Sequence, residues 1–250
     1  MRKKRDIIDE VLSRRTRHMH RVPRLDQTEH RLVDLDGGIY FLQRDTSIPL
    51  RHRRELYRHV PVALIAITEG YCKMLYRDLI DSGDPFLSNA KSFKDIRFDL
   101  EALVATHQRL ATIGEIVAQQ LSHSSLGDME SHLSVVLGQD FPAEFSKRLK
   151  AEDATIGGEV FQTQLRRLIV YTFRQRHIYC HELATRVSPR QYELRTMIKA
   201  FRVFIRLIDE HATATINNTS TPRSNGQQSH PLCQTLPARA AARIAGRRQP

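Results

Sequence analysis

The stretch PVALIAITEGYCKMLYRDLI, residues 61–80, constrains the fold more than any other part of this chain. It begins with a proline, which suits the first turn of a helix, and it is apolar on nearly every side from Val62 to Ile67. Apolar residues then recur at helical spacing, and Ser82-Gly83-Asp84-Pro85 ends the pattern. Because a helix that is apolar all round has to be covered on every side, this segment should be the core of a helical domain.

The remainder of the body also has the pattern of helices. Residues 92–123 open with Ser92 and Asp95 at capping-box spacing and predict one amphipathic helix of about thirty residues. Shorter helices are expected at 127–138, capped by Asp128, and at 142–153, started by Pro142, before Gly157-Gly158 interrupts the chain. A long helix is predicted over 159–186, and a closing helix runs from a cap at Ser188 and Pro189 to His211. The expected fold class is therefore all-α.

The two flanks differ from this body. Residues 31–44 run apolar around Asp36-Gly37-Gly38, a typical turn between short strands, so a small β-hairpin leaning on the body is expected there. Residues 212–250 are rich in Ser, Thr, Asn, Pro and Arg with few large apolar residues, which predicts a disordered basic tail. The predicted organisation is an amino-terminal basic segment over 1–59, a helical domain over 60–211 and the tail.

The formal net charge of +11 lies in the flanks, because residues 60–211 carry 19 basic and 19 acidic side chains. Within the body, however, residues 161–211 carry 10 basic residues against 4 acidic ones, which indicates either a positive surface or an ordinary solvated helix face. No apolar run is long enough to span a membrane, and no apolar signal core follows the basic amino terminus. The three cysteines, Cys72, Cys180 and Cys233, have no CxxC spacing, so a reducing cytoplasm fits best.

The stretch RQRHIYCHELA, residues 174–184, concentrates histidine, cysteine, glutamate and arginine within about three helical turns. His177 and His181 would share a helix face beside Cys180 and Glu182, but two histidines make at most half a zinc site, and neither HExxH nor HxxEH is present. We therefore predict no metal and no cofactor. Cys180 is next to a histidine in sequence but would point about 100° away from it, which is more typical of a small buried residue than of a nucleophile.

Arg176 and His181 form an Arg-x4-His pair. The chain has four such pairs, of which chance alone predicts one or two, and the other three are Arg15/His20, Arg54/His59 and Arg206/His211. Only Arg176/His181 lies inside a strongly apolar helix that follows two long helices and precedes a closing one. In this context residues 61–211 resemble the HEPN superfamily, whose ribonuclease members carry an Arg-x4-6-His motif, commonly with a polar residue after the arginine, here His177.

The resemblance implies an up-down bundle of two long helices, a motif helix and a closing helix, and a homodimer whose motifs meet across a shared groove. It implies that Arg176 stabilises the phosphate and His181 acts as general acid or base, supported by His177 and by Glu69. Glu69 interrupts the apolar core helix and would either pair with Arg176 or face water. Further RNA contacts would come from basic and aromatic side chains nearby, each of which could equally be solvated surface or core: Arg166, Arg167, Arg174, Tyr179 and Arg190.

The function expected from this reading is a metal-independent endoribonuclease, of the bacterial defence or toxin type, with RNA as substrate and a cognate antitoxin or defence partner in the cell. Histidine suits the proton transfers and arginine suits phosphate oxygens. The alternative is a non-catalytic helical protein that binds RNA, a nucleotide or a protein partner. A plain helical scaffold with a chance motif also stays open.

Overall fold

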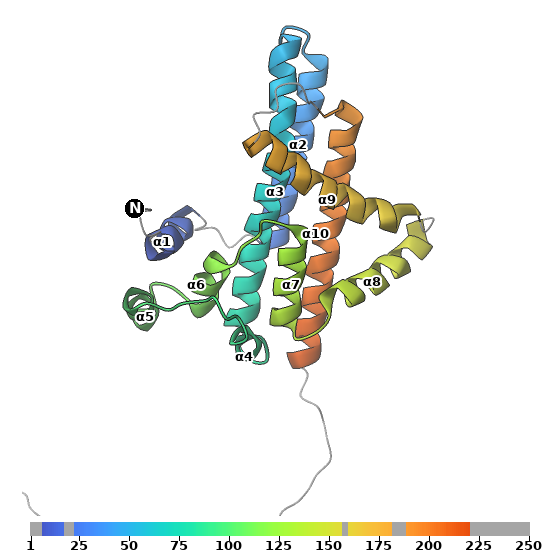
Figure 1. Ribbon diagram of the computed structural model, residues 1–250. Coiled ribbons are helices and arrows are strands. Elements are labelled where there is room, and N and C mark those ends of the chain that lie inside the picture. The colour runs from blue at the N-terminus through green and yellow to red at the C-terminus, as the bar shows by residue number, and fades with distance from the viewer. Residues whose placement is uncertain (1–6, 18–22, 157–159, 182–188, 221–250) are drawn as a thin grey trace, which may run out of the picture. The chain divides into compact units, whose positions relative to one another are not determined.

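The computed structural model describes residues 7–17, 23–156, 160–181 and 189–220, and the regular secondary structure in these ranges is α-helix, with no strand (Figure 1). The all-α prediction is confirmed. In chain order the helices are α1 (Ile7–Arg17), α2 (Arg24–Arg44), α3 (Leu50–Asp81), α4 (Phe86–Ala90), α5 (Leu100–His107), α6 (Ile113–Gln120), α7 (Leu126–Leu137), α8 (Phe141–Ile156), α9 (Val160–His181) and α10 (Gln191–Ser220). No helix within the described ranges is both long and apolar enough to cross a bilayer.

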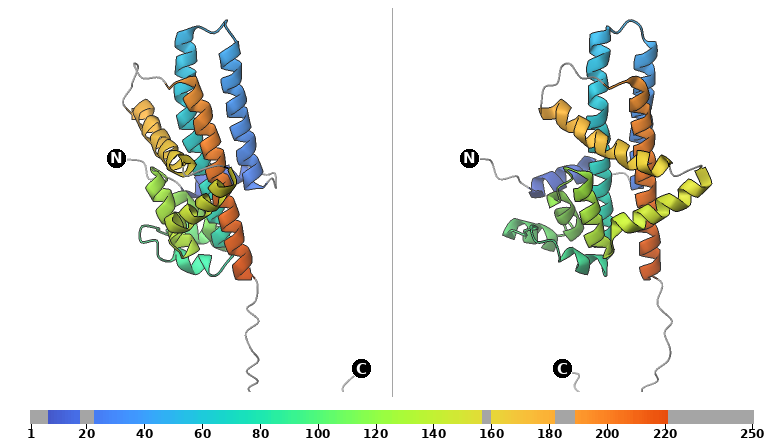
Figure 2. Two further views of the ribbon diagram at one scale, coloured as in Figure 1. Left: turned by 90° about the vertical axis from the view of Figure 1, so that its right-hand side faces the viewer. Right: turned by 45° about the vertical axis from the view of Figure 1, so that its right-hand side comes forward.

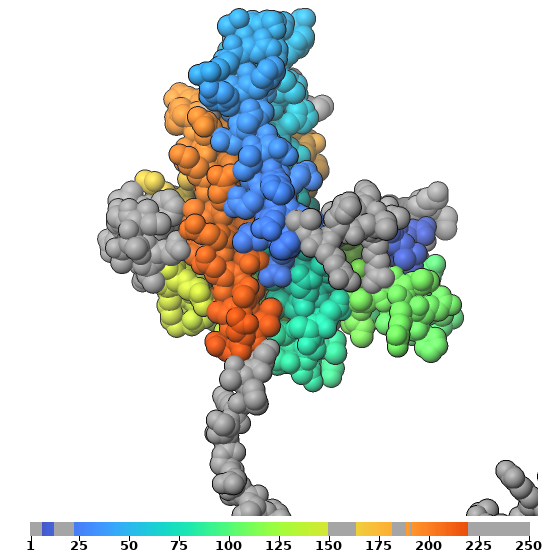
Figure 3. Space-filling model, turned by 180° about the vertical axis from the view of Figure 1, so that it is seen from behind, coloured from blue at the N-terminus to red at the C-terminus, as the bar shows by residue number. Residues whose placement is uncertain are grey.

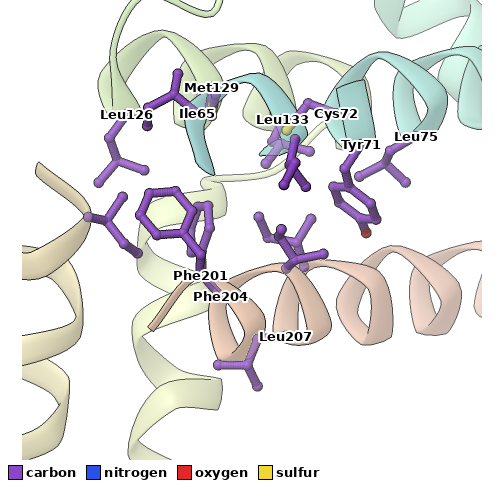
Figure 4. Packing of buried hydrophobic residues seen from close by; sticks show 14 of the residues in the cluster. Ile65, Tyr71, Cys72, Leu75, Leu126, Met129, Leu133, Phe201, Phe204 and Leu207 are labelled. Atoms are coloured by element: carbon purple, nitrogen blue, oxygen red, sulfur yellow. The ribbon is translucent and has the colours of Figure 1, made fainter. Parts of the chain in front are cut away.

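Helix α3 is the centre of the core, as its apolar pattern predicts. It contacts α2, α6, α7, α9 and α10 (Figure 2). Its buried side chains pack against those of α7 and α10 (Figure 4). The helix begins at Leu50, eleven residues before the predicted start, so Pro61 lies inside it and is itself buried. An internal proline removes one backbone hydrogen bond, and the burial of Tyr57, Val60 and Leu64 on either side of it offsets that cost.

The predicted hairpin over 31–44 is wrong, because these residues belong to α2. Thr28, Leu32 and Ile39 recur at helical spacing and are buried against α3 and α10, whereas Gly37 and Gly38 lie on the exposed side of the helix. Two glycines weaken a helix by about 1 kcal/mol each, and burying two large aliphatic side chains contributes more than that. Tertiary packing therefore overrides the local turn signal, and α2, which lies against α10 on the face shown in Figure 3, is part of the main core.

The predicted long helix over 92–123 is also wrong. Residues 92–99 are not helical, the N-cap of α5 is Asp99, and the chain breaks again after His107, where Arg109 adopts a left-handed φ of 60°. Helix α6 starts at a capping box formed by Thr112 and Glu115. Its first turn is attached to the end of α3, where Asp81 accepts hydrogen bonds from the Thr112 hydroxyl at 2.6 Å and the Gly114 amide at 2.9 Å. These contacts turn α6 against α3 instead of continuing α5.

The remaining helices follow the sequence pattern with shifted ends. Helices α7 and α8 confirm the two shorter predictions, although α7 is capped by Ser125 with Asp128 as the third residue of its capping box. Helix α9 confirms the predicted helix up to His181, and the predicted features at 182–186, Gly157-Gly158, Val187 and Ser188 fall outside the described residues. Helix α10 continues to Ser220, nine residues beyond the predicted end, and Ala212 is fully buried, so residues 212–220 are not tail. Residues 221–250 lie outside the described ranges.

A polar network joins α2, α3 and α10 inside this core. The Arg24 guanidinium donates to Asp209 at 2.8 Å and to Asp78 at 2.9 Å, and the buried Tyr71 hydroxyl donates to the same Asp209 oxygen at 2.9 Å. Arg77 forms a further ion pair with Asp78. Because Arg24 and Asp209 are each less than one fifth exposed, the network holds the amino-terminal end of α2 in a fixed register against α3 and α10.

Candidate nucleic-acid interface on α9

Helix α9 places one face against the core and the other in solvent. The inner face carries Leu165, Ile169, Thr172 and Phe173, which are buried. The helix packs on α3 and α10, which it crosses in Figure 2. The Thr172 hydroxyl donates to the Leu168 carbonyl, so this buried polar group is satisfied within the helix. The apolar spacing of i, i+4 and i+7/i+8 explains why this side of the sequence is covered.

The outer face of α9 carries a stripe of basic and aromatic residues, which we call the α9 stripe. It consists of Arg167, Tyr171, Arg174, His177 and His181, all exposed. Steps of three and four residues keep them within less than a quarter turn of a common line along the helix. The His177 and His181 rings lie side by side, with their centroids 5.0 Å apart. The structure thus brings together four of the predicted site residues, Arg167, Arg174, His177 and His181.

Arg176 does not belong to this stripe. It lies about 140° round the helix from His181, and it is half-buried where His181 is exposed. The structure, which describes both side chains, contains no ion pair between Glu69 and Arg176. The carboxyl end of α9 lies beside the amino-terminal part of α3, since the charge of Arg58 is near enough to the Tyr179 hydroxyl to oppose the rise in its pKa caused by burial. Glu69 is eleven residues further along α3, or about 16 Å, which explains why the pair does not form.

Tyr179 and Cys180 are also placed differently from expectation. Tyr179 is half-buried, and burial raises the pKa of its hydroxyl to about 12. That hydroxyl is hidden from solvent with no hydrogen-bond partner among the described residues, so Tyr179 faces the protein and not a ligand. Cys180 is exposed, against the prediction of a buried residue. Within the described ranges no three His, Cys, Asp or Glu side chains are grouped as metal ligands would be, and Glu182 falls outside them.

The predicted phosphate-binding arginines divide into two kinds. Arg166 donates through both terminal nitrogens to Glu130 of α7, whose side chain is only 8% exposed, and this hydrogen bonding raises the pKa of Arg166. Arg166 therefore neutralises a buried carboxylate. Arg167 and Arg174 are exposed and have no carboxylate partner among the described residues. Arg190 is exposed at the start of α10, where its backbone amide donates to Glu193 at 3.0 Å.

A groove between α8 and α9 adjoins the α9 stripe, and its volume is about 640 Å³. The described residues that line it are Phe145, Ser146, Leu149, Arg166, Arg167, Val170, Tyr171 and Arg174. Sequence reasoning missed both the groove and Tyr171. The signal that could have found Tyr171 is its spacing, four residues after Arg167 and three before Arg174. The groove itself depends on the packing of α8, which no local pattern shows.

A second histidine cluster lies inside the protein and was not predicted. His123 is 5% exposed and stacks on Tyr76 at 5.5 Å between ring centroids, and His132 meets both rings edge-on. Burial lowers the pKa of His123 to about 4, helped by Lys73 and His132 and opposed by the Leu121 backbone and Asp128. Burial also lowers the pKa of His132. His123 is therefore held neutral in the core, and the half-buried His132 packs against it.

No family model, curated protein or solved structure matches the chain. The fold and the surface therefore define its class by themselves: an all-helical protein with a basic, histidine-bearing face on α9 beside an arginine-lined groove.

Proposed function

We propose that this protein is a metal-independent endoribonuclease that works along the α9 stripe. The observation that carries the proposal is the exposed arrangement of Arg167, Arg174, His177 and His181 on one helix face. Exposed guanidinium groups that have no carboxylate partner within the described ranges suit phosphate oxygens, and two adjacent imidazoles suit an acid and a base. The resemblance of the Arg176/His181 segment to HEPN ribonucleases points to the same chemistry and remains part of the proposal.

The proposed reaction uses two proton transfers. One imidazole of the His177/His181 pair takes the proton of the ribose 2′-hydroxyl, whose oxygen attacks the neighbouring phosphorus. The other imidazole, protonated, gives its proton to the departing 5′-oxygen, and the product strand ends in a 2′,3′-cyclic phosphate. Arg174, one turn before His177, stabilises the negative charge of the phosphorane. Arg176, which the resemblance assigns to the phosphate, is half-buried in the single chain, so Arg174 takes that part here.

A second copy of the chain is part of the proposal, because one helix face is a convex surface and cannot enclose a phosphate. Two α9 stripes facing each other would form the sides of a cleft, and Arg190 and Arg167 would border it. The proposed setting is the cytoplasm, with a cognate antitoxin or defence partner that restrains the activity. Sedimentation of the purified chain tests the dimer, and a mass that corresponds to one chain at micromolar concentration would contradict it.

The experiment is an RNA cleavage assay in excess EDTA with the wild type and single alanine variants. We expect the wild type to leave 2′,3′-cyclic phosphate ends, and we expect His181→Ala, His177→Ala and Arg174→Ala to lose about a hundredfold or more of the rate. His107→Ala is the matched control, because His107 is an exposed histidine on α5. Arg176→Ala decides between the two arginines. If it lowers the cleavage rate more than Arg174→Ala does, Arg176 and not Arg174 stabilises the phosphorane. Equal cleavage by all variants would refute the site.

The groove between α8 and α9 favours one alternative, an RNA- or nucleotide-binding protein without catalysis. Its arginines and Tyr171 can hold a strand whether or not the histidines react. Under this alternative the wild type and all variants leave the RNA intact in the cleavage assay. Arg167→Ala and Arg174→Ala weaken RNA binding, and His181→Ala does not. A protein that binds only another protein would bind no RNA at all.

A further inference from the structure

We propose that the groove between α8 and α9 holds one unpaired nucleobase, so that the substrate of the α9 stripe is single-stranded RNA. This inference rests on the proposed function and adds to it the class of substrate. It is carried by the residues on the two walls of the groove and by their position relative to His177 and His181.

The walls of the groove are apolar where a base would lie. Phe145 and Leu149 come from α8, and Val170 and Tyr171 come from α9. Val170 is 50% exposed and Tyr171 is 39% exposed, so α9 presents an aliphatic and an aromatic surface to the open side of the groove. Exposed apolar surface beside charged groups marks binding sites, and an aromatic ring at such a site stacks on bases without regard to sequence.

The charges at the groove suit a nucleotide and not an apolar ligand. Arg167 and Arg174 flank Tyr171 on the same helix face. The pKa of the Tyr171 hydroxyl is raised by burial and by the Glu193 carboxylate of α10, and Arg174 acts on it in the opposite direction. Both guanidinium groups are exposed and have no carboxylate partner within the described ranges. Arg166 also lines the groove, but it is paired with Glu130 and offers no free cation there. A base between the walls would therefore have arginines beside it for the phosphates on either side.

The position of the groove along α9 connects the bound base to the proposed chemistry. Tyr171 precedes His177 by six residues, a rise of about 9 Å, and Arg174 lies between them on the same stripe. A base against Tyr171 would place its phosphate at Arg174 and the next phosphate at the histidine pair. A base inside a duplex has both faces covered by its neighbours and cannot enter such a groove. The geometry therefore selects an unpaired strand.

The test measures binding by fluorescence anisotropy in a His181→Ala background with EDTA, which prevents cleavage of the probe. The probes are a labelled single strand, the duplex of the same sequence, and the same single strand with abasic residues in place of several nucleotides. Tyr171→Ala is compared with Tyr171→Phe, which keeps the aromatic ring. Tyr40→Ala is the matched control, because Tyr40 is an exposed tyrosine on α2, remote from the groove. Helicity and thermal midpoint are recorded for each variant.

We expect Tyr171→Ala to weaken binding of the single strand by about fivefold or more, the loss of one base–aromatic stack, with no effect on the abasic strand. Tyr171→Phe and Tyr40→Ala should bind as the parent protein does. Equal binding of duplex and single strand, or an equal effect of Tyr171→Ala on both single strands, would overturn the inference. If Arg174→Ala weakens binding and Tyr171→Ala does not, the groove proposal fails while the α9 stripe stands. If the parent protein binds no RNA, both proposals fail.

Discussion

Replacement of Gly37 and Gly38 by alanine should stabilise the protein, because both glycines lie inside α2. Neither has a positive φ, and a Cβ added at either position meets no atom within 4 Å. Alanine is favoured over glycine in a helix interior by about 1 kcal/mol, so the double variant should gain about 2 kcal/mol if the two sites are independent. For a folded unit of this size that corresponds to a rise of about 4–8 °C in the thermal midpoint.

The assay is urea unfolding followed by circular dichroism. The free energies of unfolding are compared for variants with the same m-value, the slope of that free energy against urea concentration. Gly114→Ala is the opposing control, since its Cβ would lie 2.6 Å from the Arg77 carbonyl oxygen and 2.7 Å from an Asp81 carboxylate oxygen. Overpacking against a backbone atom should cost about 1–3 kcal/mol at that position.

The result that would refute this reasoning is a loss of stability in the Gly37→Ala/Gly38→Ala variant. A two-residue hairpin turn needs positive φ at these positions, where alanine is strained. Destabilisation by 1 kcal/mol or more would therefore indicate that residues 31–44 form the hairpin that their local sequence predicts, and not α2.

Three further predictions test the core and the site. Stability should fall by about 3 kcal/mol through His123 alone as the pH drops from 6.5 to 4, because the unfolded histidine takes up a proton in this window and the folded one, with its pKa lowered to about 4, does not. Unfolding curves of His123→Phe should show a correspondingly shallower pH dependence, and equal slopes would contradict the burial of a neutral imidazole. Asp209→Ala should lower the free energy of unfolding by about 2–3 kcal/mol, because it leaves Arg24 with one carboxylate and Tyr71 without its acceptor. A change below about 0.5 kcal/mol, the spread of surface substitutions, would show that the network is not formed. Arg166→Ala should lower stability by about 1–2 kcal/mol because it leaves Glu130 unpaired, whereas Arg167→Ala should leave stability unchanged. If Arg166→Ala weakens RNA binding but does not lower stability, the structural role of Arg166 is contradicted.

The candidate site was predictable in part. The spacing of Arg174, His177 and His181 on a helix could be read directly, because three- and four-residue steps share a face whatever the fold. The roles of Arg166, Arg176 and Tyr179 could not, because each depends on what packs against α9 at that point. Glu130 comes from α7, 36 residues earlier, and no local pattern connects it to Arg166.

The sequence by itself determined that the protein is all-helical and that residues 61–80 lie at its centre, since apolar residues on every side of a helix leave no other place for it. It also located α7, α8 and most of α9 and α10 through their caps and apolar stripes. Only the tertiary structure decided that Asp36-Gly37-Gly38 continues a helix and that residues 92–123 break into two. In both places the local preference is worth about 1 or 2 kcal/mol. The burial of Leu32 and Ile39 outweighs it in α2, and the hydrogen bonds from the first turn of α6 to Asp81 outweigh it in residues 92–123. The same reason explains the α9 stripe: all of its residues except Tyr171 were candidates from the sequence, but which of them face solvent was set by the core beneath.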